Sequence, residues 1–268
     1  MIQAKSIDWP RKRDLLGVHL SEVTYDRVLD TLVEAARHRR PAIASFFAVH
    51  AVVTHGRDSK LRQMVNRFDM IAPDGMPVRW AMNLLYRARL PSNVRGTGTM
   101  LLMCERAARE GMSIYLYGGT PETIEILQEN LLRAYPGLKI AGAESPPFRK
   151  LTEEEDAEVV RRINDSGAHF LFIGLGCPKQ DIFASEHQDS IHAVQLCVGA
   201  AFDFHAGKTR EAPHWMQRSG LEWFYRLCQE PRRLWKRYLV TNTQFVQMVA
   251  RQGLGMLFTR SRGESSNG

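Results

Sequence analysis

The chain has 268 residues, of which 44% are hydrophobic and 24% are charged, with a formal net charge of +7. This composition supports one substantial hydrophobic core and excludes disordered, fibrous and disulfide-stapled classes. No stretch reaches the roughly 18 to 20 uncharged apolar residues of a spanning helix, and the first 17 residues lack the apolar centre of a signal peptide. We therefore expect a cytoplasmic protein that does not span a membrane.

The positive charge is concentrated at the C-terminus. From Lys208 onward there are eleven Lys and Arg residues but four Glu and no Asp, so the rest of the chain is neutral. A basic segment on a neutral body indicates a phosphate-rich partner, which can be a nucleic acid, an anionic membrane surface or a pyrophosphate substrate.

Apolar runs alternate with helical patterns, which predicts an α/β fold with a parallel or mixed sheet and helices on both faces. The strands are expected near 42–48, 68–72, 113–117, 138–142, 169–174 and 193–198. The helices are expected at 22–38, 50–66, 77–87, 98–110, 121–134, 153–165 and 179–188.

The alternation stops after Gly199, and the remaining C-terminal segment is helical and basic, with a helix break expected at Pro231. We predict an α/β domain over 1–205 and a basic amphipathic appendage over 206–268. Its polar tail, 261–268, is expected to be frayed and disordered.

Asp74 follows an expected strand in the sequence APDGMPVRW. Ligands of open α/β sheets bind at the carboxyl ends of strands, so this carboxylate can face a cleft. The alternative is that Asp74 only caps the following helix.

Two glycine turns follow other strands, in YLYGGTPE and GLGCPKQD. Glycine permits close backbone approach, and free amides at a helix start attract phosphate oxygens. Lys179 adds a point charge and Gln180 an amide at the second turn. Each turn is also an ordinary helix start, with Thr120 as N-cap in the first and Lys179 as a surface residue in the second. Neither turn matches the dinucleotide fingerprint or a Walker loop.

Other polar groups have a structural interpretation as well as a functional one. Asp203 and His205 are two positions apart, which is compatible with a metal pair or an acid/base pair. We favour the interpretation that both are buried residues with structural hydrogen bonds. The four cysteines have no Cys-x-x-Cys spacing and are predicted to be buried, reduced thiols: Cys104, Cys177, Cys197 and Cys228.

Residues 220–239 interleave aromatic residues with arginines, and Leu234, Tyr238, Phe245 and Val249 recur at helical spacing. Such a helix suits a membrane surface, and it equally suits packing on the α/β domain with a solvated basic face. The spacing alone favours the packed helix.

The motifs PDGMPVRW, RGTGTMLL, YLYGGTPE and GLGCPKQD, and above all GAAFDFHAGKTREAPHWMQRSGLEWFYRLCQEPRRLWKRYL, resemble the WecG/TagA/CpsF family of bacterial glycosyltransferases over about residues 14–245. The resemblance implies a Rossmann-like core with a C-terminal helical appendage that engages the membrane. It implies metal-independent, inverting transfer from a UDP-sugar to a polyprenyl-pyrophosphate-linked saccharide at the inner membrane face. No metal or other cofactor is expected.

The resemblance also implies roles for individual residues. Asp74 takes the place of the catalytic aspartate. The donor or nucleotide is expected to contact Ser45, Arg95, Gly118, Gly119, Gly174, Gly176, Lys179 and Gln180. Pyrophosphate, the acceptor or the membrane is expected to contact Arg226, Arg232, Arg233 and Arg237.

One departure concerns the first core strand, where the family shows Thr-x-Asn and this chain has Ser45-Phe46-Phe47. Ser45 can replace a threonine hydroxyl, but Phe47 cannot replace an asparagine amide. The identity of the donor sugar is therefore left open, with N-acetylmannosamine, its uronic acid and glucose as the candidates.

The leading hypothesis is a peripheral-membrane glycosyltransferase for an exopolysaccharide or cell-envelope polymer. The alternative is a non-catalytic nucleotide-binding module whose basic tail docks on a membrane or nucleic acid. A dehydrogenase is a weaker rival, because the acidic residue expected about twenty positions after a glycine fingerprint is missing. Exposed aromatic residues in the appendage would favour a homo-oligomer.

Overall fold

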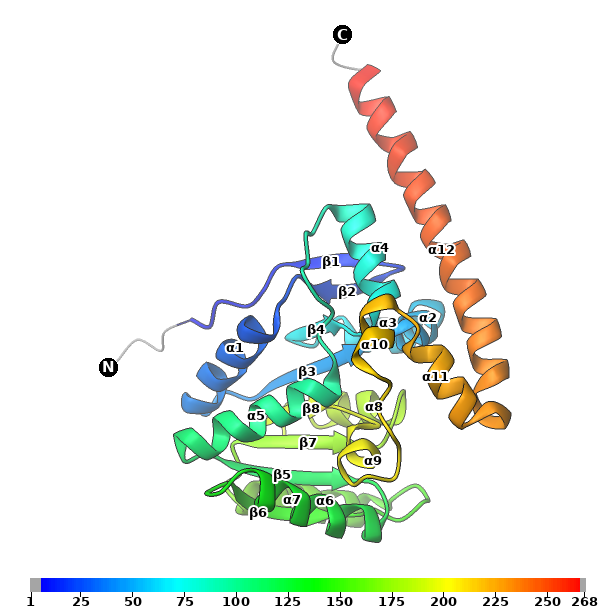
Figure 1. Ribbon diagram of the computed structural model, residues 1–268. Helices are drawn as coiled ribbons and strands as arrows, with labels where there is room; N and C mark the ends of the chain where they lie inside the picture. The colour runs from blue at the N-terminus through cyan, green and yellow to red at the C-terminus, as the bar shows by residue number, and fades with distance from the viewer. Residues whose placement is uncertain (1–5, 266–268) are drawn as a thin grey trace.

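The computed structural model describes residues 6–265, except for the side chains of Arg233, Arg237 and residues 259–265. Its centre is a sheet of six parallel strands in the order β4-β3-β8-β7-β5-β6 (Figure 1). These strands are β3 (Ala42–Phe47), β4 (Met70–Pro73), β5 (Ser113–Gly118), β6 (Lys139–Glu144), β7 (Phe170–Gly174) and β8 (Val194–Cys197). All six strand predictions are confirmed. Five of the strands are largely buried and form the apolar runs that the sequence shows, whereas the edge strand β6 has no buried residue.

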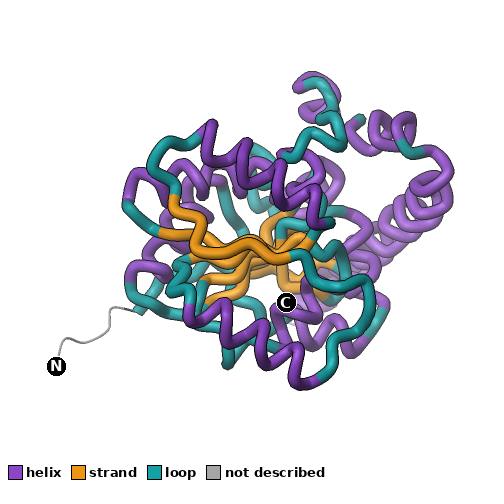
Figure 2. Tube along the Cα trace, turned by 90° about the horizontal axis from the view of Figure 1, so that it is seen from below, coloured by secondary structure: helices purple, strands orange, loops and turns teal. Residues whose placement is uncertain are grey.

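Helices connect the strands and cover both faces of the sheet (Figure 2). They are α1 (Tyr25–Arg37), α2 (Val49–Arg57), α3 (Ser59–Val65), α4 (Met76–Tyr86), α5 (Gly96–Glu110), α6 (Pro121–Ala134), α7 (Glu153–Asp165), α8 (Lys179–Glu186) and α9 (Ala201–His205). The α/β prediction with a parallel sheet is therefore confirmed.

The structure differs from the predicted elements in two places. A hairpin of β1 (Lys12–Leu15) and β2 (Val18–Ser21) precedes the sheet and was not predicted. The single helix expected at 50–66 is two helices, because the Asp58 side chain accepts hydrogen bonds from the amides of Lys60 and Leu61 and so starts α3.

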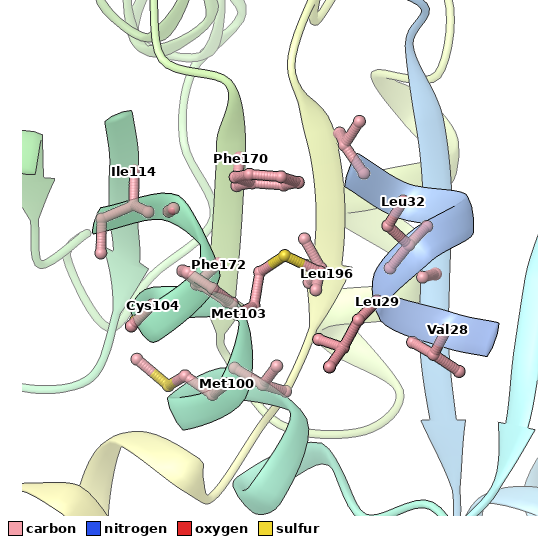
Figure 3. Close-up of a cluster of buried hydrophobic side chains, with 14 of the residues drawn as sticks. Val28, Leu29, Leu32, Met100, Met103, Cys104, Ile114, Phe170, Phe172 and Leu196 are labelled. Carbon is pink, nitrogen blue, oxygen red and sulfur yellow. The ribbon is translucent and has the colours of Figure 1, made fainter. Parts of the chain in front are cut away.

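Each face of the sheet has its own core. One core joins the sheet to α1, α5, α6 and α9, and Figure 3 shows part of it, with Leu32 on α1, Met103 on α5 and Phe172 on β7. The other joins the sheet to α2, α4, α7 and α8 and reaches Phe245 near the C-terminus. Two buried faces fix the sheet rigidly, so the loops at its carboxyl edge have a firm base.

The C-terminal segment consists of α10 (His214–Ser219), α11 (Glu222–Gln229) and α12 (Pro231–Ser265). The break at Pro231 is confirmed. We call α10, α11 and α12 the appendage. Helix α12 lies against α2, and its C-terminal end extends beyond α4 (Figure 1).

Polar contacts fix α12 to the body near Gln252. Its side-chain oxygen accepts from the Leu16 amide at 3.0 Å, and its nitrogen donates to the Asp14 carbonyl at 2.7 Å. The helix continues through Ser265, into the segment 261–268 that the sequence predicts to be frayed, and residues 266–268 lie outside the described chain.

Candidate functional site

Three of the expected site residues lie on loops at one edge of the sheet. Asp74 follows β4, Gly119 follows β5 and Gly176 follows β7. Because these strands are parallel, their carboxyl ends meet at the same edge. This edge is where open α/β sheets bind their ligands.

Asp74 is partly buried, and the surrounding backbone holds it in place. Its amide donates to the Phe47 carbonyl at 3.1 Å, and its Oδ2 accepts from the Gly96 amide at 3.2 Å. Gly75, with φ of 79°, is the N-cap of α4 and gives no side-chain capping bond. The interpretation of Asp74 as the cap of that helix is therefore wrong, because its carboxylate points instead to the start of α5.

The pKa of Asp74 is raised to about 6. Burial is the main cause, because it disfavours the charged carboxylate. The charge of Arg95 opposes this rise, Glu222 adds to it, and the Gly96 amide and Arg226 oppose it again. Two of these charged residues, Glu222 and Arg226, belong to α11, so the appendage influences the pKa of Asp74.

Arg95 joins the body to the appendage. Its guanidinium donates to Gln217 Oε1 at 2.7 Å, to Glu222 Oε1 at 2.9 Å and to Glu211 Oε2 at 3.3 Å. Its side chain is 12% exposed. The sequence predicts Arg95 as a donor contact, and the structure places it near Asp74 with its guanidinium bonded to appendage side chains.

Arg226 is an appendage arginine whose charge acts on Asp74. Its guanidinium carbon is 5.3 Å from the centre of the Phe204 ring, and its Nε is buried with no hydrogen-bond partner among the described residues. Arg232 is exposed at the start of α12. The side chains of Arg233 and Arg237 lie outside the described part of the chain.

Close packing explains why glycine occupies some positions of the two glycine turns. A Cβ on Gly118, which has φ of 132°, would lie 2.6 Å from the Gly174 backbone, and one on Gly174 would lie 2.6 Å from the Phe202 ring. The Gly119 amide donates to the Gly174 carbonyl at 3.2 Å. Gly176 differs, because nothing described lies within 4 Å of where its Cβ would be. Among the four glycines, Gly176 is the one with open space beside it.

Gln180 connects two loops of the edge. Its Oε1 accepts from the Gly176 amide at 3.2 Å, its Nε2 donates to the Cys197 carbonyl at 3.2 Å, and it is 5% exposed. The side chain expected to contact the donor thus holds the β7–α8 turn against β8. Lys179 is exposed beside it.

Ser45 and Phe47 point into the protein interior. The Ser45 hydroxyl donates to Asp181 Oδ1 at 2.8 Å, and Ser45 is fully buried. Phe47 is 1% exposed, with its ring centre 4.6 Å from that of His55. The replacement of the family's asparagine therefore removes a polar side chain and fills the core with an aromatic ring.

Asp203 and His205 do not form a pair. His205 Nε2 lies 3.0 Å from the Thr97 carbonyl, which confirms the structural interpretation for His205, whereas Asp203 is exposed. The prediction of buried thiols is confirmed for Cys104 and Cys197. It is wrong for Cys228, which is exposed because α11 has no fully buried residue, and Cys177 is partly exposed.

No sequence pattern indicates Glu211, Gln217 and Glu222 as neighbours of the site. In the sequence of a basic amphipathic segment, an isolated glutamate is typical of a solvent-exposed residue. The contact of these residues with Arg95 depends on how α10 and α11 fold back, which no local pattern records. Tyr25, whose hydroxyl accepts from the Arg95 amide at 2.9 Å, was missed for the same reason.

The fold and the site define an α/β enzyme with a carboxylate among cations at the carboxyl edge of a parallel sheet. The family model of the Glycosyl transferase WecG/TagA/CpsF family matches residues 13–257, and the chain belongs to this family. It is therefore a glycosyltransferase. Within residues 6–265, no helix combines the length and the apolar character needed to cross a membrane.

Proposed function

We propose that this enzyme transfers a sugar from a UDP-sugar to a hydroxyl group of a polyprenyl-pyrophosphate-linked saccharide, with inversion at the anomeric carbon. The observation that carries the proposal is the position of Asp74. It is a partly buried carboxylate at the carboxyl end of β4 with a pKa raised to about 6, and its electrostatic neighbours include Arg95 and Arg226.

Asp74 is suited to act as the general base. Oδ2 is held by the Gly96 amide, and Oδ1 has no hydrogen-bond donor among the groups that the structure describes. With a pKa of about 6, the carboxylate is mostly ionised at neutral pH and is a stronger base than an ordinary aspartate. Oδ1 is therefore free to take the proton of the acceptor hydroxyl.

The reaction needs one displacement. The acceptor oxygen forms a bond to the anomeric carbon while the bond from that carbon to the diphosphate of UDP breaks, and the hydroxyl proton passes to Asp74. The attack comes from the face opposite the leaving group, so the configuration inverts. No covalent enzyme intermediate is required.

The charge that develops on UDP needs cations. Arg226 is the best-placed candidate, because its Nε is buried near Asp74 without a partner in the described chain. Arg95 is already engaged by Glu211, Gln217 and Glu222, so we assign it to fixing α10 and α11 beside the site. We propose that arginines and backbone amides stabilise the leaving group without a divalent ion.

The acceptor is placed by the appendage. Trp223, Phe224 and Trp235 are 37%, 48% and 55% exposed, and Arg232 is exposed in the same segment. Aromatic rings and arginines together suit the boundary between lipid headgroups and acyl chains. We propose that this segment docks on the inner membrane face, where the saccharide of a polyprenyl-linked acceptor can reach Asp74.

The test is turnover with a lipid-linked acceptor and a panel of UDP-sugars, measured as released UDP. The proposal predicts UDP release that requires the acceptor, one preferred donor among N-acetylmannosamine, its uronic acid and glucose, and activity that persists in a chelator. Release that requires a divalent ion would overturn the metal-independent step. Binding of UDP with no turnover of any donor would contradict the proposed reaction.

A further inference from the structure

A second group of reactive side chains lies inside the protein, on the face of the sheet covered by α2 and α8. It consists of His55 from α2, Cys177 from the loop after β7 and Asp181 from α8. The side chains of His55 and Asp181 are fully buried, and Cys177 is partly exposed. One ligand atom from each residue lies within 4.8 Å of the others. None of the three is among the charges that act on Asp74.

The hydrogen bonding of His55 fixes which ring nitrogen carries the proton. Nδ1 lies 2.8 Å from the Ala51 carbonyl, which can only accept, so Nδ1 is the protonated nitrogen. In the neutral ring Nε2 then carries a lone pair. Nε2 is buried, and it has no hydrogen-bond partner in the described chain.

Asp181 presents a second lone pair to the same point. Its Oδ1 accepts the Ser45 hydroxyl at 2.8 Å, and the Cys177 side chain also acts on this carboxylate as a hydrogen-bonding neighbour. Oδ2 is buried, and no donor meets it in hydrogen-bond geometry among residues 6–265. Oδ2 and His55 Nε2 are 3.4 Å apart. Two facing lone pairs in a buried site repel each other unless a proton or a cation lies between them.

The donor set selects the cation. An imidazole nitrogen, a thiolate and a carboxylate are zinc ligands, and a metal-bound histidine usually donates its other ring N–H to a backbone carbonyl, as His55 does to Ala51. With zinc bonds of about 2.0 to 2.3 Å, tetrahedral ligand atoms lie roughly 3.3 to 3.8 Å apart. The 3.4 Å between Nε2 and Oδ2 fits this spacing. Cys177 is partly exposed, so the cluster is accessible to an ion from its side.

We propose that His55 Nε2, Cys177 Sγ and Asp181 Oδ2 bind one divalent transition-metal ion, zinc by ligand type, that fastens α2 to α8 beneath the carboxyl edge of the sheet. The ion is structural. It lies apart from the transfer chemistry at Asp74, which needs no metal.

The test uses Co²⁺ as a spectroscopic substitute for zinc, added to the chelator-treated, reduced full-length protein. The proposal predicts a thiolate-to-cobalt absorption band that saturates at one ion per chain and is displaced by Zn²⁺. Cys177→Ser should abolish the band, and Asp181→Asn should weaken binding at least tenfold. Cys228→Ser is the matched control, because it removes an exposed thiol far from the cluster in sequence, and it should leave the titration unchanged.

Thermal unfolding gives a readout that does not depend on the thiol. Zn²⁺ should raise the Tm of the wild-type protein and of Cys228→Ser but not that of Asp181→Asn, in which the amide can still accept the Ser45 hydroxyl. A cobalt band that is absent, or one that persists in Cys177→Ser, would overturn the proposal. A proton shared by His55 and Asp181 would then account for the two facing atoms.

Discussion

The body and the appendage are held together by different means. In the body, strands such as β3 and β7 are buried on both faces of the sheet, so packing fixes each loop at the carboxyl edge. In the appendage, none of the residues Glu222–Gln229 is fully buried, and Arg95 holds α11 through Glu222. The comparison indicates that the rigid body positions Asp74, the proposed base, while a lightly packed helix brings the charges of Glu222 and Arg226 to it.

The largest effect is expected from removing the base. Asp74→Asn should lower kcat by about 10² to 10⁴-fold, because the amide cannot take the acceptor proton. The affinity for UDP should change little, since the nucleotide is bound by other groups. Turnover measured as UDP release and UDP binding measured by calorimetry separate the two effects. Wild-type turnover in Asp74→Asn would exclude Asp74 as the base.

The same substitution should stabilise the body. The folded pKa of Asp74, about 6, lies above its ordinary value of 3.8, so its contribution to stability is present below pH 4 and is lost as the pH rises through 6. Asp74→Asn should therefore gain at most about 3 kcal/mol at pH 8, and the gain should shrink towards pH 4. Urea unfolding at several pH values measures it, with Asp203→Asn as an exposed control. A loss of stability at pH 8 would contradict the electrostatic account.

In the appendage, the largest effect on catalysis is expected from Arg226, whose Nε is buried. Arg226→Ala should lower kcat/KM about 10- to 100-fold, because a charge-assisted contact to the leaving diphosphate is lost. Arg218→Ala, which removes an exposed arginine from α10, should change kcat/KM less than twofold. Steady-state kinetics of both variants checks this. Equal losses would mean that the charge of the appendage acts without regard to position.

The smallest effect is expected at the membrane-facing side of the appendage. Arg232→Ala should weaken binding to anionic vesicles about fivefold, because each basic residue near an anionic leaflet contributes about 1 kcal/mol. Arg133→Ala, which removes an exposed arginine from the body, is the control. Vesicle sedimentation at fixed ionic strength measures both variants. No difference between them would place the membrane contact elsewhere.

The sequence predicted the body far better than the appendage. Continuous apolar runs such as Phe170–Ile173 identify buried parallel strands. The two strands of the β1–β2 hairpin have only four residues each, and the first begins with Lys12 and Arg13, so they give no such pattern. In the appendage, the apolar side of the helix predicted from the spacing of Leu234 and Phe245 is confirmed for these two residues, which are buried.

The site was predictable in part. The structure places Asp74 directly after β4, as the sequence predicted, and its role as the base stays a prediction from the family motif. The donor contact of Gln180 stays a prediction. Its bond to the Gly176 amide was not predicted, because an amide at a helix start has the same sequence pattern whether it faces a ligand or the backbone. The approach of Glu222 to Arg95 depends on tertiary packing, and no local pattern contains it.

The most direct test of the central claim is the pH dependence of kcat/KM for the wild-type enzyme and for Glu222→Gln. If Asp74 is the base, log kcat/KM should fall with unit slope below about pH 6, and Glu222→Gln should move this limb to lower pH, because it removes a negative charge that raises the pKa of Asp74. Glu211→Gln, which removes the longest of the three Arg95 contacts, should move the limb less. A limb near pH 4, or one that stays in place in Glu222→Gln, would contradict the assignment of Asp74 as a base tuned by the appendage.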